Sequence, residues 1–194
     1  MNQGVYSYIK HFALYEGNGK MVSVWSNEQA IREIYLKPFE ISVKKGGANA
    51  VMVSWSFLGH KWTGENSSLL NTVLRDEWGF RGMALTDFFR NNGHGFMNAD
   101  AALANGVDAM LSTFDGPENN VADRSHPTSV KQMRNACKNV MYTVVSSWAY
   151  DGGGTSVGME TWKKAAIGLD VVLVLGLAAV EIIVIKGSGK RKEM

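Results

Sequence analysis

The feature that most constrains the fold is a regular alternation of short apolar runs and helical patterns along residues 5–148. Each apolar run is strand-like and is followed by a segment whose apolar side chains have helical spacing, which makes four consecutive βα units. The expected strands cover 5–13, 50–55, 82–87 and 107–112, and the expected helices cover 27–45, 68–79, 96–105 and 128–148. Near-continuous apolar strands of this kind build parallel sheets that are covered on both faces. The predicted fold class is therefore α/β.

Local signals mark the ends of the first two helices. Ser26 and Gln29 form a capping-box pattern at the start of the first helix, and Gly46-Gly47 follows its end. Gly79 ends the second helix in the same way. These signals predict the boundaries of 27–45 and 68–79.

Two architectures commonly hold such units, and the sequence favours one of them. No glycine-rich dinucleotide fingerprint follows any expected strand, which speaks against a nucleotide-binding doubly wound sheet. The other architecture is the eight-unit TIM-type barrel, which typically needs about 250 residues. Four βα units would form half of such a barrel, so we expect an incomplete one.

Composition excludes several classes of protein. The 194 residues carry 20 basic and 18 acidic side chains, so the total charge indicates no nucleic-acid partner. Cys137 is the only cysteine, which excludes an internal disulfide, and His60, His94 and His126 lack metal-ligand spacing. We therefore expect no metal and no cofactor. The first ten residues, MNQGVYSYIK, lack the apolar core of an export signal.

A second feature separates the C-terminus from the rest of the chain. Residues 165–185 form an apolar run of roughly 30 Å in helical form, which matches the thickness of a bilayer core. Lys163 and Lys164 precede the run, and the more numerous cations Lys186, Lys190, Arg191 and Lys192 follow it, which favours a cytoplasmic C-terminus. A buried core helix is the alternative, and Asp170 and Glu181 argue for it, since carboxylates in a membrane are costly.

Length, flanking charge and terminal position favour a single-pass membrane anchor over a core helix. The expected organisation has four parts: a partial barrel at 1–150, a glycine-rich linker at 151–162, a transmembrane helix at 163–186 and a basic cytoplasmic tail at 187–194. The catalytic part would then lie outside the cell, next to a lipid bilayer.

Reactive groups of a βα barrel lie where its strands end. Lys10 and His11 stand at the end of the first expected strand, Met52 and Trp55 belong to the second, and Asp87 closes the third. A carboxylate, a cation, an imidazole and an aromatic ring would then face one opening. This combination suits a polyol, because charged groups bind hydroxyls while an aromatic ring covers the apolar face of a sugar.

Each of these residues also has a purely structural interpretation. Asp87 could cap the following segment as an Asx turn. Lys10 could be an ordinary surface lysine, His11 a structural histidine, and Trp55 part of the core. From spacing alone these interpretations are at least as strong as the functional ones.

Four stretches resemble glycoside hydrolase family 3, which contains β-glucosidases and related retaining exo-glycosidases. They are YIKHFAL (8–14), REIYLKPFEISVKKGGANAVM (32–52), WTGENSSLLNTVLRDEWGFRGMALTDF (62–88) and ALANGVDAML (102–111). The similarity covers roughly residues 4–148 in family order. The Lys-His-Phe block and the Leu-Arg-Asp-Glu-Trp-Gly-Phe stretch before Thr-Asp are its most specific signals.

The resemblance implies a role for each candidate residue. Asp87 matches the catalytic nucleophile, which forms a covalent glycosyl-enzyme, and Lys10 and His11 match the pair that binds sugar hydroxyls. Met52 matches a residue that lines the same subsite. Trp55 stands where the family usually has tyrosine, and Phe88 stands where it often has tryptophan.

Other parts of the family pattern are altered or missing. The polar loop after Lys-His-Phe-Ala usually ends in Asn-Arg, whereas LYEGNGKM offers only Lys20. Retaining hydrolysis needs an acid/base carboxyl about 5 Å from the nucleophile. In the family this group comes from a separate domain, which is not evident here, and the first half of the barrel is missing as well. The chain resembles the C-terminal end of a family member with permuted domains.

Three hypotheses follow. The chain is part of a membrane-anchored retaining exo-β-glycosidase that acts on terminal β-linked sugars of a β-glycoside or oligosaccharide and is inactive alone. It is a catalytically silent, membrane-tethered carbohydrate-binding or scaffold protein. Or it is a fragment without function of its own. We favour the first, with the missing barrel half and acid/base domain supplied by the same polypeptide or a partner.

Overall fold

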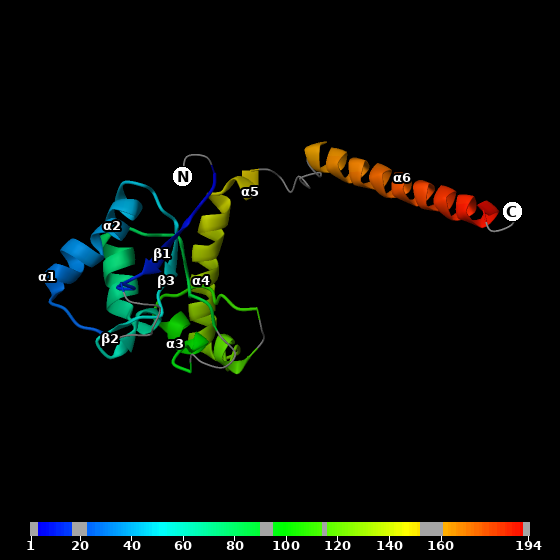
Figure 1. Ribbon diagram of the computed structural model, residues 1–194. Coiled ribbons are helices and arrows are strands. Elements are labelled where there is room, and N and C mark those ends of the chain that lie inside the picture. The colour runs from blue at the N-terminus through cyan, green and yellow to red at the C-terminus, as the bar shows by residue number, and fades with distance from the viewer. Residues whose placement is uncertain (1–3, 17–22, 90–94, 114–115, 152–160, 192–194) are drawn as a thin grey trace. The chain divides into compact units, whose positions relative to one another are not determined.

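The computed structural model describes residues 4–16, 23–89, 95–113, 116–151 and 161–191 (Figure 1). The chain divides into two compact units, Met1–Gly153 and Gly154–Met194. The division agrees in place with the expected end of the βα region. The expected linker at 151–162 lies largely outside the described residues, whereas residues 187–191 of the expected basic tail belong to the last helix.

A parallel three-stranded sheet forms the centre of the first unit. Its strands are β1 (Tyr8–Phe12), β3 (Ala50–Val53) and β6 (Met83–Leu85), in the order β1-β3-β6. The predicted strands at 5–13, 50–55 and 82–87 are thus confirmed in type and direction, with shorter bounds. The sheet is parallel because each strand returns through a helical segment, as the βα pattern predicts.

The fourth predicted strand, 107–112, is reduced to one bridge between Leu85 and Ala109. The backbone N–H groups of Thr86 and Phe89 do donate to the carbonyls of Ala109 and Leu111. The N–H of Leu111, however, donates to the side-chain Oγ1 of Thr86 at 2.9 Å. A side chain thus replaces a backbone acceptor, and the ladder is interrupted although the segment lies beside β6.

The helical segments follow the predicted positions with changed bounds. The segment predicted at 27–45 consists of α1 (Glu28–Ala30), a π-helical turn η1 (Ile31–Tyr35) and α2 (Lys37–Lys44). The predicted helix at 68–79 is η3 (Ser68–Glu77), the one at 96–105 is α3 (Ala99–Ala104), and the last is α4 (Pro127–Val145) with α5 (Trp148–Asp151). The 3₁₀ turns η2 (Thr63–Glu65) and η4 (Pro117–Asn119) complete the unit.

The helix-end predictions were partly wrong. The capping residue of α1 is Asn27, whose side chain accepts from the N–H of Ala30 at 2.8 Å, and the Ser26–Gln29 box is not formed. Asn and Ser are equally good caps, so spacing alone could not choose between neighbours. The glycine stops are confirmed: Gly47 and Gly79 follow their helices with φ of +63° and +73°, which favours glycine.

A small second sheet was not predicted. It contains β2 (Ser23–Val24), β4 (Phe57–Leu58) and β5 (Lys61–Trp62), in the order β2-β4-β5. Two-residue strands carry no periodicity that a sequence pattern can detect. The sheet joins the loops that follow β1 and β3.

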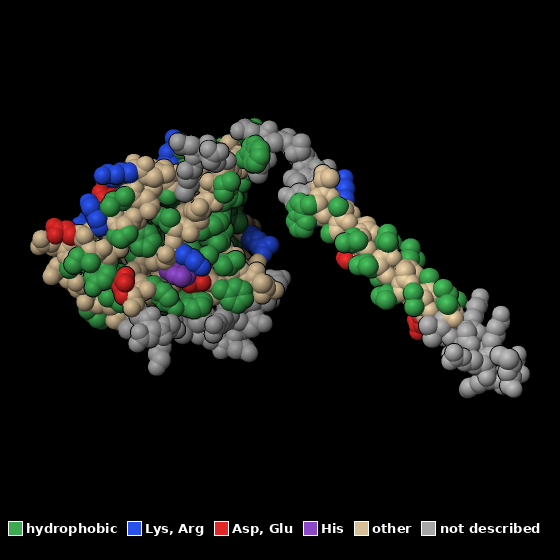
Figure 2. All heavy atoms as spheres, turned by 45° about the horizontal axis from the view of Figure 1, so that its top comes forward, with side chains coloured by type: hydrophobic (Ala, Val, Ile, Leu, Met, Phe, Trp, Pro, Cys, Tyr) green, Lys and Arg blue, Asp and Glu red, His purple; other side chains and the backbone are tan. Residues whose placement is uncertain are grey.

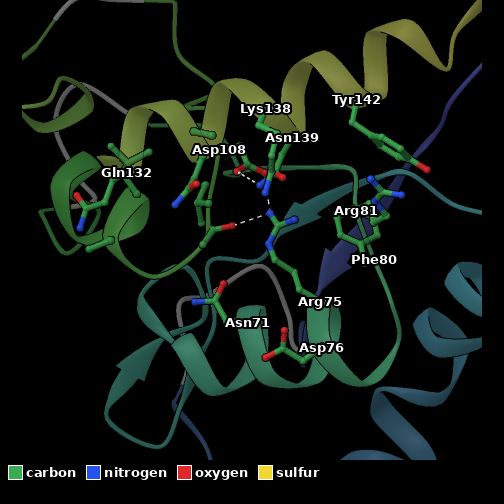
Figure 3. A pocket seen from close by; sticks show the side chains of 16 residues that line it. Asn71, Arg75, Asp76, Phe80, Arg81, Asp108, Gln132, Lys138, Asn139 and Tyr142 are labelled. Atoms are coloured by element: carbon green, nitrogen blue, oxygen red, sulfur yellow. Dashed lines mark hydrogen bonds and ion pairs between the residues drawn. The ribbon is translucent and has the colours of Figure 1, made fainter. Parts of the chain in front are cut away.

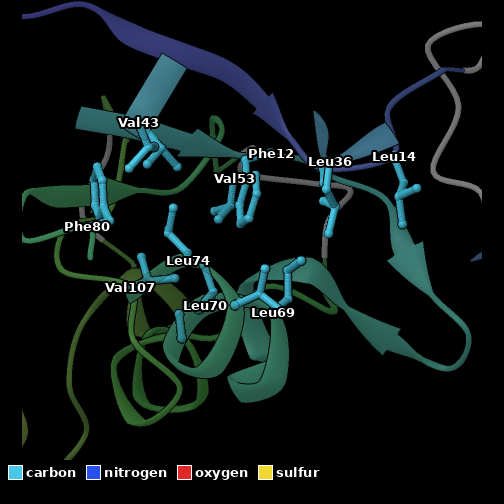
Figure 4. Close-up of a cluster of buried hydrophobic side chains, with 14 of the residues drawn as sticks. Phe12, Leu14, Leu36, Val43, Val53, Leu69, Leu70, Leu74, Phe80 and Val107 are labelled. Carbon is cyan, nitrogen blue, oxygen red and sulfur yellow. The ribbon is translucent and has the colours of Figure 1, made fainter. Parts of the chain in front are cut away.

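The hydrophobic core lies between one face of the main sheet and the helices (Figure 4). Phe12 and Val53 extend from the sheet toward Leu70 and Leu74 of η3, and Val43 of α2 adds to the same cluster. Leu70 and Leu74 are completely buried. The spacing of Leu70, Val73 and Leu74 along η3 gives it the apolar face that covers the sheet.

The second unit contains α6 (Thr161–Arg191), which covers the run predicted at 163–186. Within it, Thr161–Ile183 is long and apolar enough to cross a membrane, with a mean hydropathy of 2.4. Hydrophobic side chains line the described part of this helix (Figure 2). Asp170 and Glu181 are eleven positions apart, which is close to three helical turns, so they share one face.

Candidate active site

Asp87 lies immediately beyond β6, and the backbone on both sides of it is fixed. Its N–H donates to the carbonyl of Val53 at 3.1 Å, which continues the pairing of β6 with β3. The preceding residue, Thr86, is completely buried, and its N–H donates to the carbonyl of Ala109 at 3.0 Å. The sheet therefore holds Asp87 from two directions, as the position at a strand end predicts.

The carboxylate of Asp87, just beyond the end of β6, faces His11 of β1. Nε2 of His11 lies 3.4 Å from Oδ2 of Asp87, and the two side chains are 25% and 11% exposed. Both are accessible, but neither is freely solvated. The register of β1 on β3 shifts between Ile9 and Phe12. A bulge of this kind redirects a side chain, and His11 lies within it.

The other oxygen of Asp87 shows that no Asx turn is formed. Oδ1 accepts from the N–H of Phe88 at 2.7 Å, one residue along the chain. An Asx turn would use the N–H two residues along, and that group, on Phe89, donates to the carbonyl of Leu111 at 2.9 Å. The Asx turn is therefore not formed, although Oδ1 binds the backbone that follows, and Oδ2 lies toward His11.

Met52 lies on the face of the sheet that continues into Asp87. Met52 is in register with Leu85, two residues before Asp87, and alternation along an extended chain places these side chains on one side. Lys10 is exposed, and Met52 is half-buried. Figure 2 shows one histidine next to a basic and an acidic side chain in a largely hydrophobic surface.

Trp55 packs against the margin of the core cluster. It is half-buried, and its indole N–H donates to the backbone carbonyl of Phe88 at 3.2 Å. Trp62, in contrast, is 1% exposed and donates to the carbonyl of Ser54, so it takes the core position. The bond from Trp55 holds the backbone that follows Asp87. Trp55 and Phe88 are therefore brought together, as predicted, beside the carboxylate.

The sequence interpretation missed Tyr15. Its ring lies 4.9 Å from the His11 ring and 6.4 Å from the Trp55 ring, between centroids. Tyr15 thus covers the side of His11 and joins two of the predicted residues. An aromatic residue three positions after β1 was the available signal, because residues just beyond a barrel strand face the opening. Lys20 and His94 lie outside the described residues.

A cavity of about 440 Å³ lies at the opposite ends of the strands (Figure 3). Asp108 lines it and accepts hydrogen bonds from Arg75 at 2.7 Å, from the N–H of Ala84 at 2.8 Å and from Asn139 at 2.8 Å. Burial raises the pKa of Asp108, although Arg75 and the other donors oppose this. Residues at the N-terminal ends of barrel strands serve stability. This cluster joins η3, β6 and α4 and is separate from the site of Asp87.

The chain belongs to the family described as glycosyl hydrolase family 3 N terminal domain, whose model matches residues 1–141. A β-glucosidase of Rhizobium radiobacter is 47% identical over 90 residues, which cover 45% of this chain and 11% of that protein. Probable β-glucosidase J of Emericella nidulans is 29% identical over 146 residues, covering 73% of this chain and 17% of that protein. The chain thus spans less than a fifth of the length of either relative.

Solved structures show the same likeness. β-Glucosidase 3B of Thermotoga neapolitana, in complex with glycerol, is 30% identical with a TM-score of 0.61, and the match covers 78% of this chain and 22% of that one. The glucose complex of the same enzyme matches over 86% of this chain with a TM-score of 0.62. The α/β fold of the chain is therefore similar to a segment of these β-glucosidases.

Proposed function

We propose that this chain is part of a retaining β-glycosidase that hydrolyses terminal β-linked sugars, with Asp87 as the nucleophile. The observation that carries the proposal is the placement of the Asp87 carboxylate at the end of β6, with Oδ2 toward His11 at 3.4 Å. The family membership and the names of the β-glucosidase relatives support a β-glycoside as the substrate.

In the proposed reaction, Oδ2 of Asp87 attacks the anomeric carbon while the bond to the leaving-group oxygen breaks. A covalent glycosyl-enzyme forms, and water then releases the sugar with retained configuration. His11 and Lys10 bind hydroxyls of the sugar, whereas Met52, Trp55 and Phe88 line its apolar side. The fixed backbone around Asp87 supports this role, because a positioned nucleophile needs little reorganisation during attack.

The reaction needs a second carboxyl about 5 Å from the first, which protonates the leaving group. We place this acid/base, and the remaining βα units of the barrel, outside the 194 residues. The chain alone is then inactive. The small share of each relative that the chain covers supports this proposal.

The test is release of the aryl group from aryl β-glycosides by the assembled protein. Asp87→Asn should abolish release, whereas Asp76→Asn, at an exposed position of η3, should leave it unchanged. Full activity in Asp87→Asn would exclude the nucleophile role. Sugar binding without turnover in the unmodified assembled protein would favour the silent carbohydrate-binding alternative, for which the altered loop at Glu16–Lys20 and Trp55 are the motivation.

We further propose that α6 anchors the chain in the cell membrane, with a cytoplasmic C-terminus and the catalytic part outside. The length and hydropathy of Thr161–Ile183 support this proposal. The full chain should remain with membranes after alkaline extraction, whereas a chain ending at residue 160 should be released. Release of both would exclude the anchor. Protease added outside intact cells should remove residues 4–151 but not the basic tail.

A further inference from the structure

Helix α6 carries two acidic side chains within an otherwise apolar run. Between residues 165 and 185, Asp170 and Glu181 are the only residues with a polar side chain. Acidic side chains interrupt the hydrophobic surface of the described part of this helix (Figure 2). Asp170 lies five positions after the start of the run and Glu181 lies four positions before its end, so each is about 6–8 Å inside it. A carboxylate at that depth in a membrane is costly unless it faces a polar partner.

The two carboxylates belong to one face of the helix. We define the acidic face as Asp170, Val174, Leu177 and Glu181, whose spacings of four, three and four residues follow one helical stripe. All four side chains are exposed in the second unit, and the described part of that unit contains no element that covers them. The acidic face is therefore open to another helix.

The described part of α6 does not itself supply a partner for these carboxylates. Asp170 and Glu181 are about 16 Å apart along the helix axis, which is too far for a bond between them. Lys163 belongs to the same stripe, seven positions before Asp170, but its Nζ lies 5.3 Å from the centroid of the Trp162 ring. Side chains of a helix also lean toward its N-terminus, which directs Lys163 away from Asp170. The partner groups must therefore come from another membrane segment.

A second copy of α6 would not supply the missing charge. Two parallel copies would place Asp170 against Asp170 and Glu181 against Glu181. Two antiparallel copies with overlapping apolar runs would place Asp170 against Glu181, because the two residues lie at nearly equal distances from opposite ends of the run. Either arrangement brings like charges together, which is unfavourable, and residues 165–185 contain no cation to balance them.

We propose that the acidic face of α6 binds a second membrane helix that carries two basic side chains at the spacing of Asp170 and Glu181. Arginine suits both places, because its planar guanidinium pairs with a carboxylate through two parallel hydrogen bonds. Such a helix offers a cation at the depth of each carboxylate and an apolar surface against Val174 and Leu177. The inference rests on the proposed membrane anchor, and it gives α6 a second role as the docking surface for a basic membrane helix.

The test uses the full chain in phosphatidylcholine vesicles with synthetic membrane helices as probes. One probe is a leucine–alanine helix with two arginines at the spacing of Asp170 and Glu181, and the other has leucine in place of both arginines. A donor fluorophore on Cys137, the single cysteine, and an acceptor on the probe report association by energy transfer. We expect the arginine helix to bind at least about tenfold more tightly than the leucine helix, because two polar contacts between helices distinguish them.

Matched variants locate the contact. The double variant Asp170→Leu and Glu181→Leu should bind both probes equally, because it removes both carboxylates from the acidic face. It also makes α6 more apolar, so it should stay in the membrane, which alkaline extraction checks. Val172→Leu changes a residue two positions from Asp170, on the opposite side of the helix, and should keep the preference for the arginine helix.

Equal binding of the two probes by the unmodified chain would overturn the proposal, and so would a preference that persists in the double variant. Energy transfer between donor-labelled and acceptor-labelled copies of the chain, lost in the double variant, would overturn it in favour of a second copy as the occupant. The proposed function is tested separately. Release of the unmodified chain by alkali would exclude the anchor itself, whereas sugar release by the assembled protein should be the same with and without Asp170 and Glu181.

Discussion

The imidazole of His11 and the carboxylate of Asp87 come within 3.4 Å although 76 positions separate them in the chain. The parallel register of β1, β3 and β6 brings the two strand ends to the same edge. Hydrogen bonds hold the backbone on either side of Asp87, and the ring of Tyr15 lies against His11. This geometry is the basis of the first prediction.

His11→Ala should lower kcat/KM for aryl β-glycosides by about 10- to 100-fold in the assembled enzyme. A hydrogen bond that involves a charged group contributes about 1.5–3 kcal/mol. The variant removes the imidazole that faces the Asp87 carboxylate on the sugar-binding side, so a loss of this size is expected. His60→Ala changes an exposed histidine and is the matched control. An unchanged kcat/KM in His11→Ala would place this residue outside the substrate site.

Thr86→Val should destabilise the fold by about 1–3 kcal/mol. The substitution keeps the shape of a completely buried side chain but leaves the N–H of Leu111 without its acceptor. Urea unfolding of the full chain in detergent, followed by tryptophan fluorescence, measures the change. Thr72→Val is the exposed control, and equal stability of the two variants would show that the Thr86 bond contributes nothing.

Leu74→Ala should destabilise the fold by about 2–5 kcal/mol, because it opens a cavity in the cluster between η3 and the sheet. Ile41→Ala, at a side chain that is 46% exposed, should cost less than about 1 kcal/mol. The same unfolding measurement compares them. A small effect in Leu74→Ala would mean that the core closes around the missing atoms.

The stability contributed by Asp108 should fall as the pH rises. Burial raises its pKa in the folded state above the ordinary carboxyl value, so folding favours the protonated form. Its contribution is complete below the ordinary carboxyl pKa and is lost as the pH passes through the higher folded-state pKa. The free energy of unfolding of the unmodified chain and of Asp108→Asn should be measured across this pH range. As the pH rises, the unmodified chain should lose stability relative to the variant.

The comparison with Asp108→Asn isolates one group from the other carboxylates. Asp76→Asn removes an exposed carboxylate of η3 and serves as the matched control. If the free energies of unfolding of the unmodified chain and of Asp108→Asn changed with pH in parallel, the expected effect of burial on Asp108 would be contradicted.

Much of the fold could be predicted because local patterns decide it. Three parallel strands, the helices between them and the stops at Gly47 and Gly79 follow from periodicity and from the left-handed conformation that glycine adopts. The fourth strand failed because its ladder depends on the Thr86 side chain, which lies about 25 residues earlier in the sequence. No local pattern contains that bond.

The candidate site, like the fold, could be predicted in part from the sequence. The sequence by itself determined that Asp87 ends an apolar strand and that Lys10, His11, Met52 and Trp55 belong to neighbouring strand ends, because the βα order brings these ends together. Only the tertiary structure decided that Asp87 forms no Asx turn and that Trp55 bonds to the Phe88 carbonyl. It alone placed Tyr15 against His11. These are contacts between segments, and their geometry depends on the bulge in β1 and the register of the sheet, which hydrophobic periodicity does not specify.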